Sequence, residues 1–339
     1  MQSPASIPTL LPEWSRQDAV LISWPTSDMD WRDYLSDIHA AYETIILTLL
    51  RFVDVVLITP SGSELGGRFL SEARSAKNTL YRVEGIELND TWIRDYGPLC
   101  LLGETGEKQA LDLRFNGWGL KFASDRDNQF ARLFFQKGYF REEVSYEDGQ
   151  SLVFEGGGIE VNSRGGGMST LPLFTYPNRN AGFSGTIMDR VAGTFGLSSL
   201  DALDLTPLPG DDTDGHVDTM VRYISDDVVL SCVELPEEGK ERLHAEVHRL
   251  PMPNPVIWEG EEKPATYANF LITNGAVLVP TYGDPEHDEE ALRVIRKHAG
   301  EREVVGVDCR ALVRQNGSLH CATMQIPEGF LDKTKLSKA

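Results

Sequence analysis

The sequence predicts an α/β fold built from recurring units, and three observations lead to this prediction. Short apolar strands alternate with amphipathic helices along the chain. Each strand–helix–strand passage leads into a short polar motif that opens another strand. These motifs recur at steps of 60, 61, 53 and 52 residues, and such an even recurrence is typical of an internal repeat or a propeller. The motifs centre on Asp95, Glu155, His216 with Asp218, Asn269 and Cys321.

The N-terminal third of the chain shows this alternation most clearly. Residues 19–25 (AVLISWP) are predicted to form an apolar strand that proline ends. Residues 33–52 are predicted to form a helix, because their apolar side chains recur with helical spacing. A strand over 53–60, a helix over 67–76 and a strand over 78–86 should follow, and the polar motif TWIRDYGPL comes next.

The same alternation returns in the C-terminal half. A helix over 186–197 and an extended segment over 203–208 are predicted before the motif DGHVDTMV. A helix over 283–299 begins with acidic residues, which favour the positive end of the helix dipole. A strand over 302–309 then precedes GSLHCATM. With 339 residues, the chain is long enough for two domains or for one large domain built from repeats.

The composition is that of an ordinary globular protein with a strongly acidic surface. The net charge of -20 repels nucleic acid and anionic lipid and attracts cationic ligands, although solubility alone would also account for it. There is no run of eighteen apolar residues and no basic leader, so we expect no membrane span, no signal peptide and a cytoplasmic location. The four cysteines form no CxxC pair, which predicts reduced thiols.

Two of the polar motifs carry side chains suited to acid–base or nucleophilic chemistry. If GHVDTMV opens a strand, His216 and Asp218 share one face and form a plausible acid–base and cation-binding pair. If LHCAT is also extended, His320 and Cys321 point to opposite faces, so the base for this thiol should come from elsewhere, with His216 the best candidate. A lone cysteine in an apolar strand is, however, more often core packing than a nucleophile.

Three other features have a purely structural interpretation as well as a functional one. The glycines after Glu155 allow close backbone approach or positive φ, but the run lacks the GKS/T ending of a phosphate loop. Trp92 beside Asp95 suits a planar cation, and a structural tryptophan near a surface acid is equally common. The histidines of HAEVH, residues 244–248, are interpreted as a solvated helix face rather than a metal pair, so no metal is expected.

Taken together, the motifs resemble the agmatine deiminase family, which includes the bacterial type of peptidyl-arginine deiminase. The resemblance covers nearly the whole chain. It implies the pentein α/β-propeller, with five ββαβ units in pseudo-fivefold arrangement around a central active site, as a single domain over residues 1–339. It also implies guanidine hydrolysis without a metal or an organic cofactor. The motifs are LPEW, LISWP, NDTWIRDYGP, FNGWG, EGGGIEV, NRN, TDGHVD, YANFLITNGAVLVPTYGDP and GSLHCATMQIP.

The same resemblance assigns roles to the catalytic residues. Cys321 would be the nucleophile and His216 the acid–base group. Glu155 would support the guanidinium and His216. Asp95 and Asp218 would clamp the guanidinium nitrogens, and the reaction would pass through a covalent thiouronium. The implied substrate-binding set is Trp92 as pocket lining, Asp95, Gly157, Asp218, and Asn269 at the rim of the site.

The substrate expected from the sequence is a small cationic guanidine. Agmatine is preferred over arginine, because an arginine-specific pocket needs a cationic partner for the substrate carboxylate. The arginines in or near the motifs are Arg94, Arg114, Arg179 and Arg222. Agmatine would give N-carbamoylputrescine and ammonia, whereas arginine or peptidyl arginine would give citrulline.

Departures from the family pattern keep the substrate open. The chain reads NGSLHC where the family has a glycine-rich run ending in IHC, and ATMQ where the family tends to read TQQ. Two other classes also remain: an amidinotransferase, which passes the amidino group to an amine, and a non-catalytic pentein used as a binding module. A homo-oligomer is compatible with the sequence.

Overall fold

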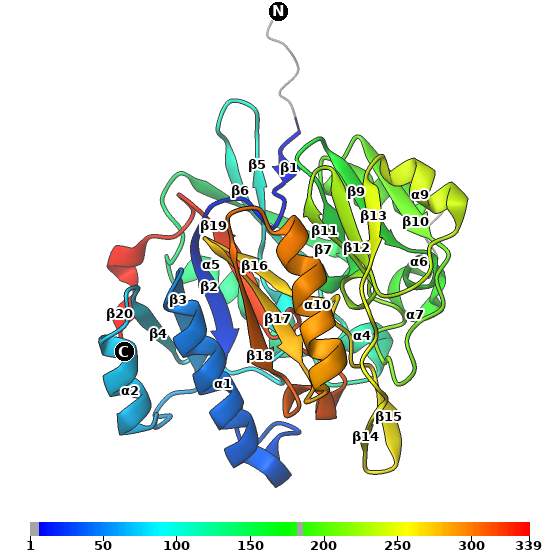
Figure 1. The fold of residues 1–339 in the computed structure, drawn as a ribbon. Coiled ribbons are helices and arrows are strands. Elements are labelled where there is room, and N and C mark those ends of the chain that lie inside the picture. Colours follow the sequence, from blue (N-terminus) through cyan, green and yellow to red (C-terminus); the bar gives the residue numbers. More distant parts are fainter. Residues whose placement is uncertain (1–6, 182–185) are drawn as a thin grey trace, which may run out of the picture.

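The computed structural model describes residues 7–181 and 186–339 as a mixed α/β fold (Figure 1). Most strands in these residues belong to five sheets, and one separate hairpin pairs β14 (Val256–Trp258) with β15 (Glu261–Lys263). In each of the five sheets, an antiparallel pair is joined through a helical connection to a strand that adds in parallel. The alternation of strands and helices predicted from the sequence is therefore confirmed.

One sheet joins the N-terminal and C-terminal parts of the chain. Its order is β19 (Thr323–Pro327), β2 (Gln17–Ser23), β3 (Asp54–Thr59), β4 (Leu80–Glu84) and β20 (Ser337–Lys338). Strand β2 is buried at every residue, as expected for a strand covered on both faces. It pairs in parallel with β3 and antiparallel with β19, so the strand that follows Cys321 is fixed to the N-terminal strand.

The other four sheets carry the remaining motifs. Their strands are β1 (Thr9–Leu10), β5 (Leu99–Leu102), β6 (Lys108–Arg114) and β7 (Val144–Val153); β8 (Glu160–Val161), β9 (Gly166–Thr170) and β10 (Ser199–Leu203); β11 (Val221–Ser225), β12 (Val228–Ser231) and β13 (Glu246–Arg249); and β16 (Leu271–Thr273), β17 (Ala276–Thr281) and β18 (Glu303–Asp308).

Helices connect these strands, and short helical turns carry several of the polar motifs. The helices are α1 (Leu35–Leu49), α2 (Gly67–Arg74), α3 (Ile93–Tyr96), α4 (Gly117–Leu120), α5 (Phe130–Gln136), α6 (Leu171–Thr175), α7 (Pro177–Asn180), α8 (Ile187–Thr194), α9 (Glu237–Leu243) and α10 (Pro285–His298). The 3₁₀ turns are η1 (Arg32–Tyr34), η2 (Asp127–Gln129), η3 (Gly156–Gly158), η4 (Val217–Thr219), η5 (Leu312–Gln315) and η6 (Lys333–Lys335). Within the described ranges, no helix is long and apolar enough to cross a membrane.

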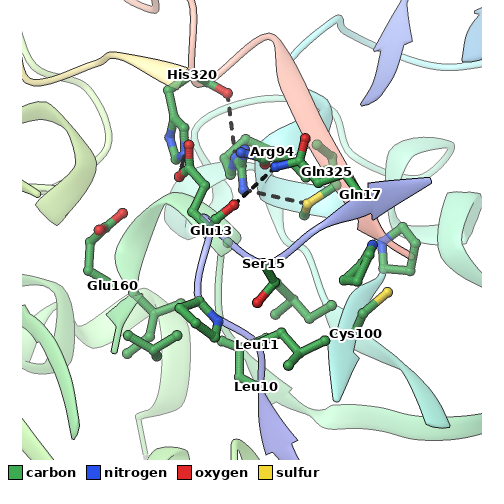
Figure 2. A pocket seen from close by; sticks show the side chains of 18 residues that line it. Leu10, Leu11, Glu13, Ser15, Gln17, Arg94, Cys100, Glu160, His320 and Gln325 are labelled. Carbon is green, nitrogen blue, oxygen red and sulfur yellow. Dashed lines mark hydrogen bonds and ion pairs between the residues drawn. The ribbon is translucent and has the colours of Figure 1, made fainter. Parts of the chain in front are cut away.

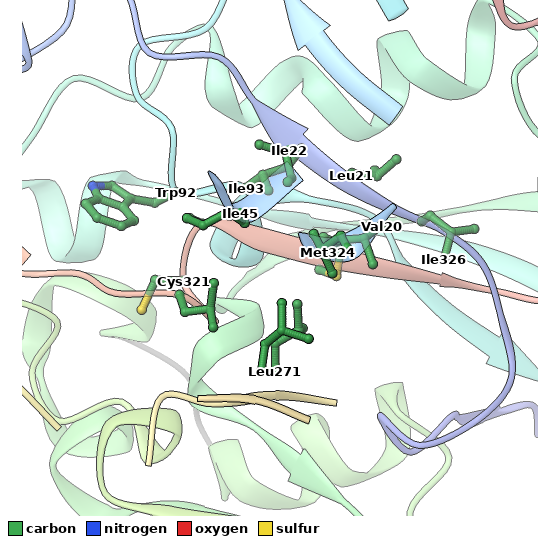
Figure 3. Close-up of a cluster of buried hydrophobic side chains, with 14 of the residues drawn as sticks. Val20, Leu21, Ile22, Ile45, Trp92, Ile93, Leu271, Cys321, Met324 and Ile326 are labelled. Atoms are coloured by element: carbon green, nitrogen blue, oxygen red, sulfur yellow. The ribbon is translucent and has the colours of Figure 1, made fainter. Parts of the chain in front are cut away.

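The main hydrophobic core lies directly beside the turn that carries Cys321. Figure 3 shows Val20 of β2, Ile45 of α1 and Met324 of β19 close together, with Cys321 and Trp92 at one side of the cluster. All five side chains are buried. Burial of each large apolar side chain contributes about 1.5–3 kcal/mol, so this packing fixes the position of the Cys321 turn firmly.

Two elements predicted outside the five polar motifs differ from the structure. The HAEVH segment is not a helix face, because α9 ends at Leu243 and His244 adopts left-handed φ of 50°. His248 then lies in β13, with its ring 4.1 Å from that of His298. The strand predicted over 203–208 instead occupies Ser199–Leu203, where parallel pairing with β9 compensates for a weakly apolar sequence.

Candidate active site

The polar motifs predicted from the sequence come together at one site. Asp95 lies in α3, Glu155 is the residue before η3, and Asp218 lies in η4. His216 is the residue before η4, and Cys321 lies in the turn before β19. Each side chain is thus carried by or beside a short turn that precedes a strand, and all five are buried.

Gly157 marks the centre of this arrangement. A Cβ atom at this position would lie 2.7 Å from His216 Nδ1, 2.8 Å from Asp95 Oδ1 and 3.0 Å from Asp218 Oδ2. Its backbone N–H donates to Asp95 Oδ1 at 2.8 Å. Gly157 does not have positive φ, so close approach is the reason for glycine here. A side chain at this position would separate the three charged groups.

The Cys321 thiol lies between Asn269 and Asp218. Its Sγ is 3.2 Å from Asn269 Nδ2 and 3.9 Å from Asp218 Oδ2. Burial raises the pKa of the thiol well above its usual value, and the negative charges of Asp218 and Asp95 raise it further. The thiol is therefore protonated at neutral pH before a substrate binds.

The segment around Cys321 is not extended, so the strand predicted there was wrong. Ala322 N donates to Ser318 O at 3.2 Å, and Thr323 N donates to His320 O at 3.1 Å. These bonds curl the chain into a turn, and β19 begins only at Thr323. His320 and Cys321 nevertheless have different surroundings. The His320 ring contacts Asp218 and Glu13. The Cys321 thiol contacts Asp218 and Asn269.

His216 is a buried imidazolium held among carboxylates. Its Nδ1 lies 3.6 Å from Asp95 Oδ1, and its Nε2 lies 3.9 Å from Glu155 Oε2. Burial alone would lower the pKa of His216, but the charges of Asp95, Glu155 and Asp218 outweigh it and raise the pKa to about 9. Nε2 has no hydrogen-bond partner among the described residues, so its proton is available to a bound molecule.

The strand predicted for GHVDTMV was also wrong, although His216 and Asp218 do face the same site. Thr219 N donates to His216 O at 3.3 Å and Met220 N to Val217 O at 3.0 Å, which closes a 3₁₀ turn. Strand β11 starts at Val221, after this turn.

Asp95 and Asp218 each accept a hydrogen bond from a neighbouring side chain. Trp118 Nε1 donates to Asp95 Oδ2 at 2.9 Å, and the His320 Nδ1–H donates to Asp218 Oδ2 at 2.7 Å. Burial raises the pKa of Asp95. Asp218 Oδ1 is buried without a hydrogen-bond partner in the described chain, and it is therefore an acceptor that a ligand can satisfy.

Glu155 is bound from behind by Arg179. The Arg179 Nε–H donates to both Glu155 carboxylate oxygens at 2.9 Å, and its other nitrogens donate to Asp214 Oδ2 at 2.6 Å and Thr213 O at 2.9 Å. Although burial would raise the pKa of Glu155, the charges of Arg179 and His216 hold it below its usual value. Arg179 therefore keeps Glu155 ionised and fixed beside His216.

A pocket of about 550 Å³, partly open to solvent, leads to the Cys321 thiol. Trp92, Trp118 and Phe122 form aromatic parts of its wall, so Trp92 lies where the sequence placed it. Four carboxylates also line it: Asp30, Asp90, Asp95 and Asp212. Among the described lining residues there is no lysine or arginine. The pocket is therefore acidic and suited to a cation with an apolar stem.

Besides Asp95, two of the lining carboxylates have raised pKa values. Burial is the main reason that the pKa of Asp90 is raised, to about 7. The negative charges of Asp30 and Asp212 also raise it. Burial also raises the pKa of Asp212 to about 6, although the side chain of Asn316 donates to it at 2.8 Å. Both groups would become more acidic when a cation binds beside them.

Asn269 differs from its sequence-based interpretation, and the structure places the four arginines that the sequence left unplaced. Asn269 is not at the rim: it is buried, and its Oδ1 accepts from His320 N at 2.9 Å beside the thiol. The arginines do not line the pocket, because three are buried in other contacts and one is exposed on β6. The buried arginines are Arg94, Arg179 and Arg222, and the exposed one is Arg114.

Trp118 and Glu13 received no role from the sequence. Trp118 belongs to the FNGWG motif, where the two flanking glycines were the available signal of an unusual conformation. Trp118 has a φ of 53°, and both glycines also have positive φ. Glu13 belongs to the LPEW motif and contacts His320 Nε2 at 2.8 Å. Glu13, Glu160 and His320 are close enough to share a cation, but the Arg222 guanidinium already contacts all three.

The profile of the Porphyromonas-type peptidyl-arginine deiminases matches residues 9–327 of the chain. An agmatine deiminase from Pseudomonas aeruginosa (strain UCBPP-PA14) is 28% identical over 375 residues, which cover 96% of this chain and 99% of the relative. These matches extend over all the motifs described above.

Solved structures agree with the sequence matches. An agmatine deiminase from C. jejuni with substrate bound is 31% identical, with a TM-score of 0.84 and coverage of 95% of this chain and 96% of that one. A Porphyromonas gingivalis protein provisionally named an arginine deiminase is 36% identical, with a TM-score of 0.83 and coverage of 95% and 99%. A dimethylarginine dimethylaminohydrolase, 14% identical with a TM-score of 0.52 and coverage of 91% and 100%, shares the fold alone. The chain thus belongs to the Porphyromonas-type peptidyl-arginine deiminase family.

Proposed function

We propose that this chain hydrolyses the guanidinium group of agmatine, giving N-carbamoylputrescine and ammonia. The observation that carries the proposal is the convergence of His216, Asp95 and Asp218 within 3.0 Å of the place where a Cβ atom of Gly157 would lie, next to the Cys321 thiol. Two carboxylates, an acid and a thiol held this close together are the groups that guanidine hydrolysis requires. The agmatine deiminases among the relatives support the same reaction.

The two carboxylates bind the planar cation in this proposal. A guanidinium presents N–H donors in one plane and has no acceptor, so it pairs well with carboxylates on its edge. Asp218 Oδ1, which has no partner among the described residues, accepts one such donor, and Asp95 accepts another. Trp92 and Trp118 enclose the alkyl stem.

Substrate binding also generates the nucleophile. The positive charge neutralises Asp95 and Asp218, which are two of the causes of the raised thiol pKa. With this repulsion removed and His216 still protonated, the thiol releases its proton to solvent. The resulting thiolate attacks the guanidinium carbon.

His216 then serves both half-reactions. The imidazolium gives its proton to the departing nitrogen, which leaves as ammonia, and Cys321 carries a thiouronium cation. Neutral His216 next takes a proton from the attacking water. The carbon–sulfur bond breaks, the second water proton restores the thiol, and the ureido product leaves. Glu155, fixed by Arg179, keeps His216 oriented through both steps.

The same proposal includes the higher-order arrangement of the fold. The five sheets, each built as strand–strand–helix–strand, are placed around one pseudo-fivefold axis as a pentein, and residues 1–339 form a single domain. The pairing of β19 with β2, which joins the last unit to the first, supports this arrangement. An experimental structure tests it directly.

Agmatine is favoured by the charge of the pocket. Asp30, Asp90 and Asp212 would attract the amine at the far end of agmatine, whereas they would repel the carboxylate of free arginine. The P. gingivalis relative named provisionally as an arginine deiminase supports arginine as the second candidate. The name of the matched family supports peptidyl arginine, which has no free carboxylate at this position.

Ammonia release from agmatine, free arginine and a blocked arginyl peptide, measured in parallel, tests the proposed function. Turnover of agmatine far above the other two substrates is the expected result. Turnover of an arginine substrate instead would retain the chemistry and change the specificity. The absence of ammonia from all three would reject the hydrolase assignment, and amidino transfer to an added amine would then be measured.

Replacing Asp212 with asparagine is expected to raise the KM for agmatine about tenfold and to change kcat little. The variant removes one charge facing the substrate amine, and a hydrogen bond to a charged group has about this effect on binding. Steady-state kinetics with agmatine measure it. The exposed Asp33→Asn variant is the control, and an unchanged KM in the Asp212 variant would contradict the assignment of the amine subsite.

The pH dependence of kcat/KM should have a basic limb near pH 9. The pKa of His216 is raised to about 9, so the imidazolium that protonates the leaving nitrogen is present below this pH and is lost above it. Initial rates between pH 7 and 10 measure the limb. A rate that continues to rise through pH 10 would show that protonated His216 is not required.

A further inference from the structure

A histidine that the mechanism above does not use, His320, lies against Asp218 and outside the lining of the Cys321 pocket. We propose that His320 is a positioning residue, which holds Asp218 Oδ2 and so fixes the carboxylate in the orientation that leaves Oδ1, unpartnered among the described residues, to accept from the substrate guanidinium. This inference rests on the proposed function, because it concerns the same site. His320 has no contact with the reacting atoms in this scheme and acts only through Asp218.

The His320 ring is fixed at both ends. Its Nδ1 lies 2.7 Å from Asp218 Oδ2, and its Nε2 lies 2.8 Å from Glu13 Oε2. An ionised carboxylate can only accept a hydrogen bond, so Nδ1 carries a proton and donates it to Asp218. His320 and Asp218 are both almost completely buried, so water does not compete for this bond.

A second layer of contacts holds the far end of the ring. Glu13 Oε1 accepts from the backbone N–H of Ile272 at 2.6 Å, and Glu13 Oε2 also accepts from Arg222. The Arg222 guanidinium donates to Phe270 O at 2.6 Å and to Glu160 Oε1 at 2.5 Å. These contacts come from separate elements of the chain, so the ring cannot turn without breaking several of them.

Figure 2 shows this layer from a second pocket, where His320, Glu13 and Glu160 lie along the wall. Cys321 does not line this second pocket, and His320 does not line the first. His320 therefore lies on the second pocket and outside the lining of the first, and its Nδ1 contacts Asp218.

The arrangement controls both the orientation and the charge of Asp218. With Oδ2 occupied by His320, the carboxylate cannot rotate freely, and Oδ1 stays without a protein partner. The other charged or titratable groups around Asp218 include His216, Asp95, Cys321, Arg94 and Arg222. Burial would raise the pKa of Asp218, but the hydrogen bond and charge of His320 lower it, with further help from His216 and Arg222.

Three substitutions at one position test the proposal. The amide nitrogen of asparagine falls near the place of Nδ1 and can still donate to Asp218, whereas that of glutamine falls near Nε2 and reaches toward Glu13 instead. With agmatine as substrate, His320→Ala and His320→Gln should lower kcat/KM about 10- to 100-fold, the effect of losing one hydrogen bond to a charged group. His320→Asn should stay within about threefold of wild type.

The acid limb of the pH profile of kcat/KM is a second measurement, and loss of a purely structural residue would not shift it. Because His320 lowers the pKa of Asp218, its loss raises that pKa, and Asp218 becomes protonated at a higher pH. The limb should therefore move up by about one pH unit in His320→Ala and His320→Gln, and by less in His320→Asn, which keeps the hydrogen bond to Asp218 but not the charge. His248→Ala, which removes an imidazole from edge strand β13, is the control and should behave as wild type.

Equal losses in the asparagine and glutamine variants, or an unshifted acid limb in His320→Ala, would overturn the proposal. A crystal structure of His320→Ala beside wild type gives a readout that needs no substrate. The Asp218 carboxylate should turn away from its wild-type orientation, and an unchanged carboxylate would also overturn the proposal.

If wild type releases no ammonia from any of the three guanidines, the proposed function fails, and this structural comparison still decides the role of His320. Melting temperatures and circular dichroism identify any variant that fails to fold, and His320→Asn then carries the test.

Discussion

The Cys321→Ser variant is expected to release ammonia from agmatine at least about 10⁴-fold more slowly than wild type. Serine keeps the shape of the side chain, but its hydroxyl is far harder to ionise than a thiol, and bound guanidinium is not enough to generate the alkoxide. Loss of an essential nucleophile costs at least this much where it has been compared in other enzymes. A coupled ammonia assay at saturating agmatine measures the effect.

A buried thiol away from the pocket provides the control. Cys100 in β5 is also buried, and burial raises its pKa strongly. Cys100→Ser should keep wild-type kcat if it folds. Acid quenching of wild type during turnover, followed by mass spectrometry, should find the thiouronium on the peptide that contains Cys321. Activity of Cys321→Ser comparable to wild type would mean that the thiol is core packing.

The His216→Gln variant is expected to lower kcat by about 10²- to 10⁴-fold, the usual contribution of a general acid–base group. Glutamine retains a polar side chain among Asp95 and Glu155 but cannot give up a proton to the leaving nitrogen or take one from water. The basic limb near pH 9 should disappear as well, because the group that titrates there is gone. Rates measured across the same pH range as for wild type test both statements.

A matched substitution separates the chemistry from general damage. His248→Gln makes the same exchange on β13 and should leave kcat and the pH profile unchanged. If His216→Gln keeps the basic limb, another group titrates near pH 9, and the assignment of the proton donor moves away from His216.

The alternation of strands and helices was the most predictable part of the fold, because the local spacing of apolar residues determines it. Strand β2 and helix α1 coincide with the predicted residues 19–25 and 33–52 within a few positions. HAEVH was misleading for a physical reason. Histidines four residues apart share a face only if the segment is helical, and the left-handed conformation of His244 ends the helix before the second histidine.

The identity of the site residues could be predicted, but their local conformation could not. His216 and Asp218 face one site as the sequence suggested, yet a 3₁₀ turn rather than a strand brings them there. The turn lies against η3 and Gly157, which are far along the chain, and no local pattern contains this contact. Cys321 also lies in a turn, because the N–H groups of Ala322 and Thr323 donate to Ser318 and His320 and curl a segment that reads as extended.

The supporting residues were the least predictable part of the site. Arg179 could have bound a substrate carboxylate, but it pairs with Glu155 instead. Asn269 was placed at the rim, and it lies beside the thiol. Such pairings depend on how separate sheets are placed relative to one another. The sequence therefore predicts which side chains do chemistry more readily than it predicts which side chains hold them.

The pairing of β19 with β2 has a consequence for how the molecule is made. Thr323 and Ile22 are neighbours in one sheet, although most of the described sequence separates them. Contacts between residues this far apart in the sequence have a large loop-closure entropy cost and form late. On the ribosome, β2 emerges long before β19, and one side of it has no partner strand during that interval. The nascent chain consequently carries an exposed strand edge, which is prone to aggregation, and it acquires a positioned thiol only near the end of synthesis.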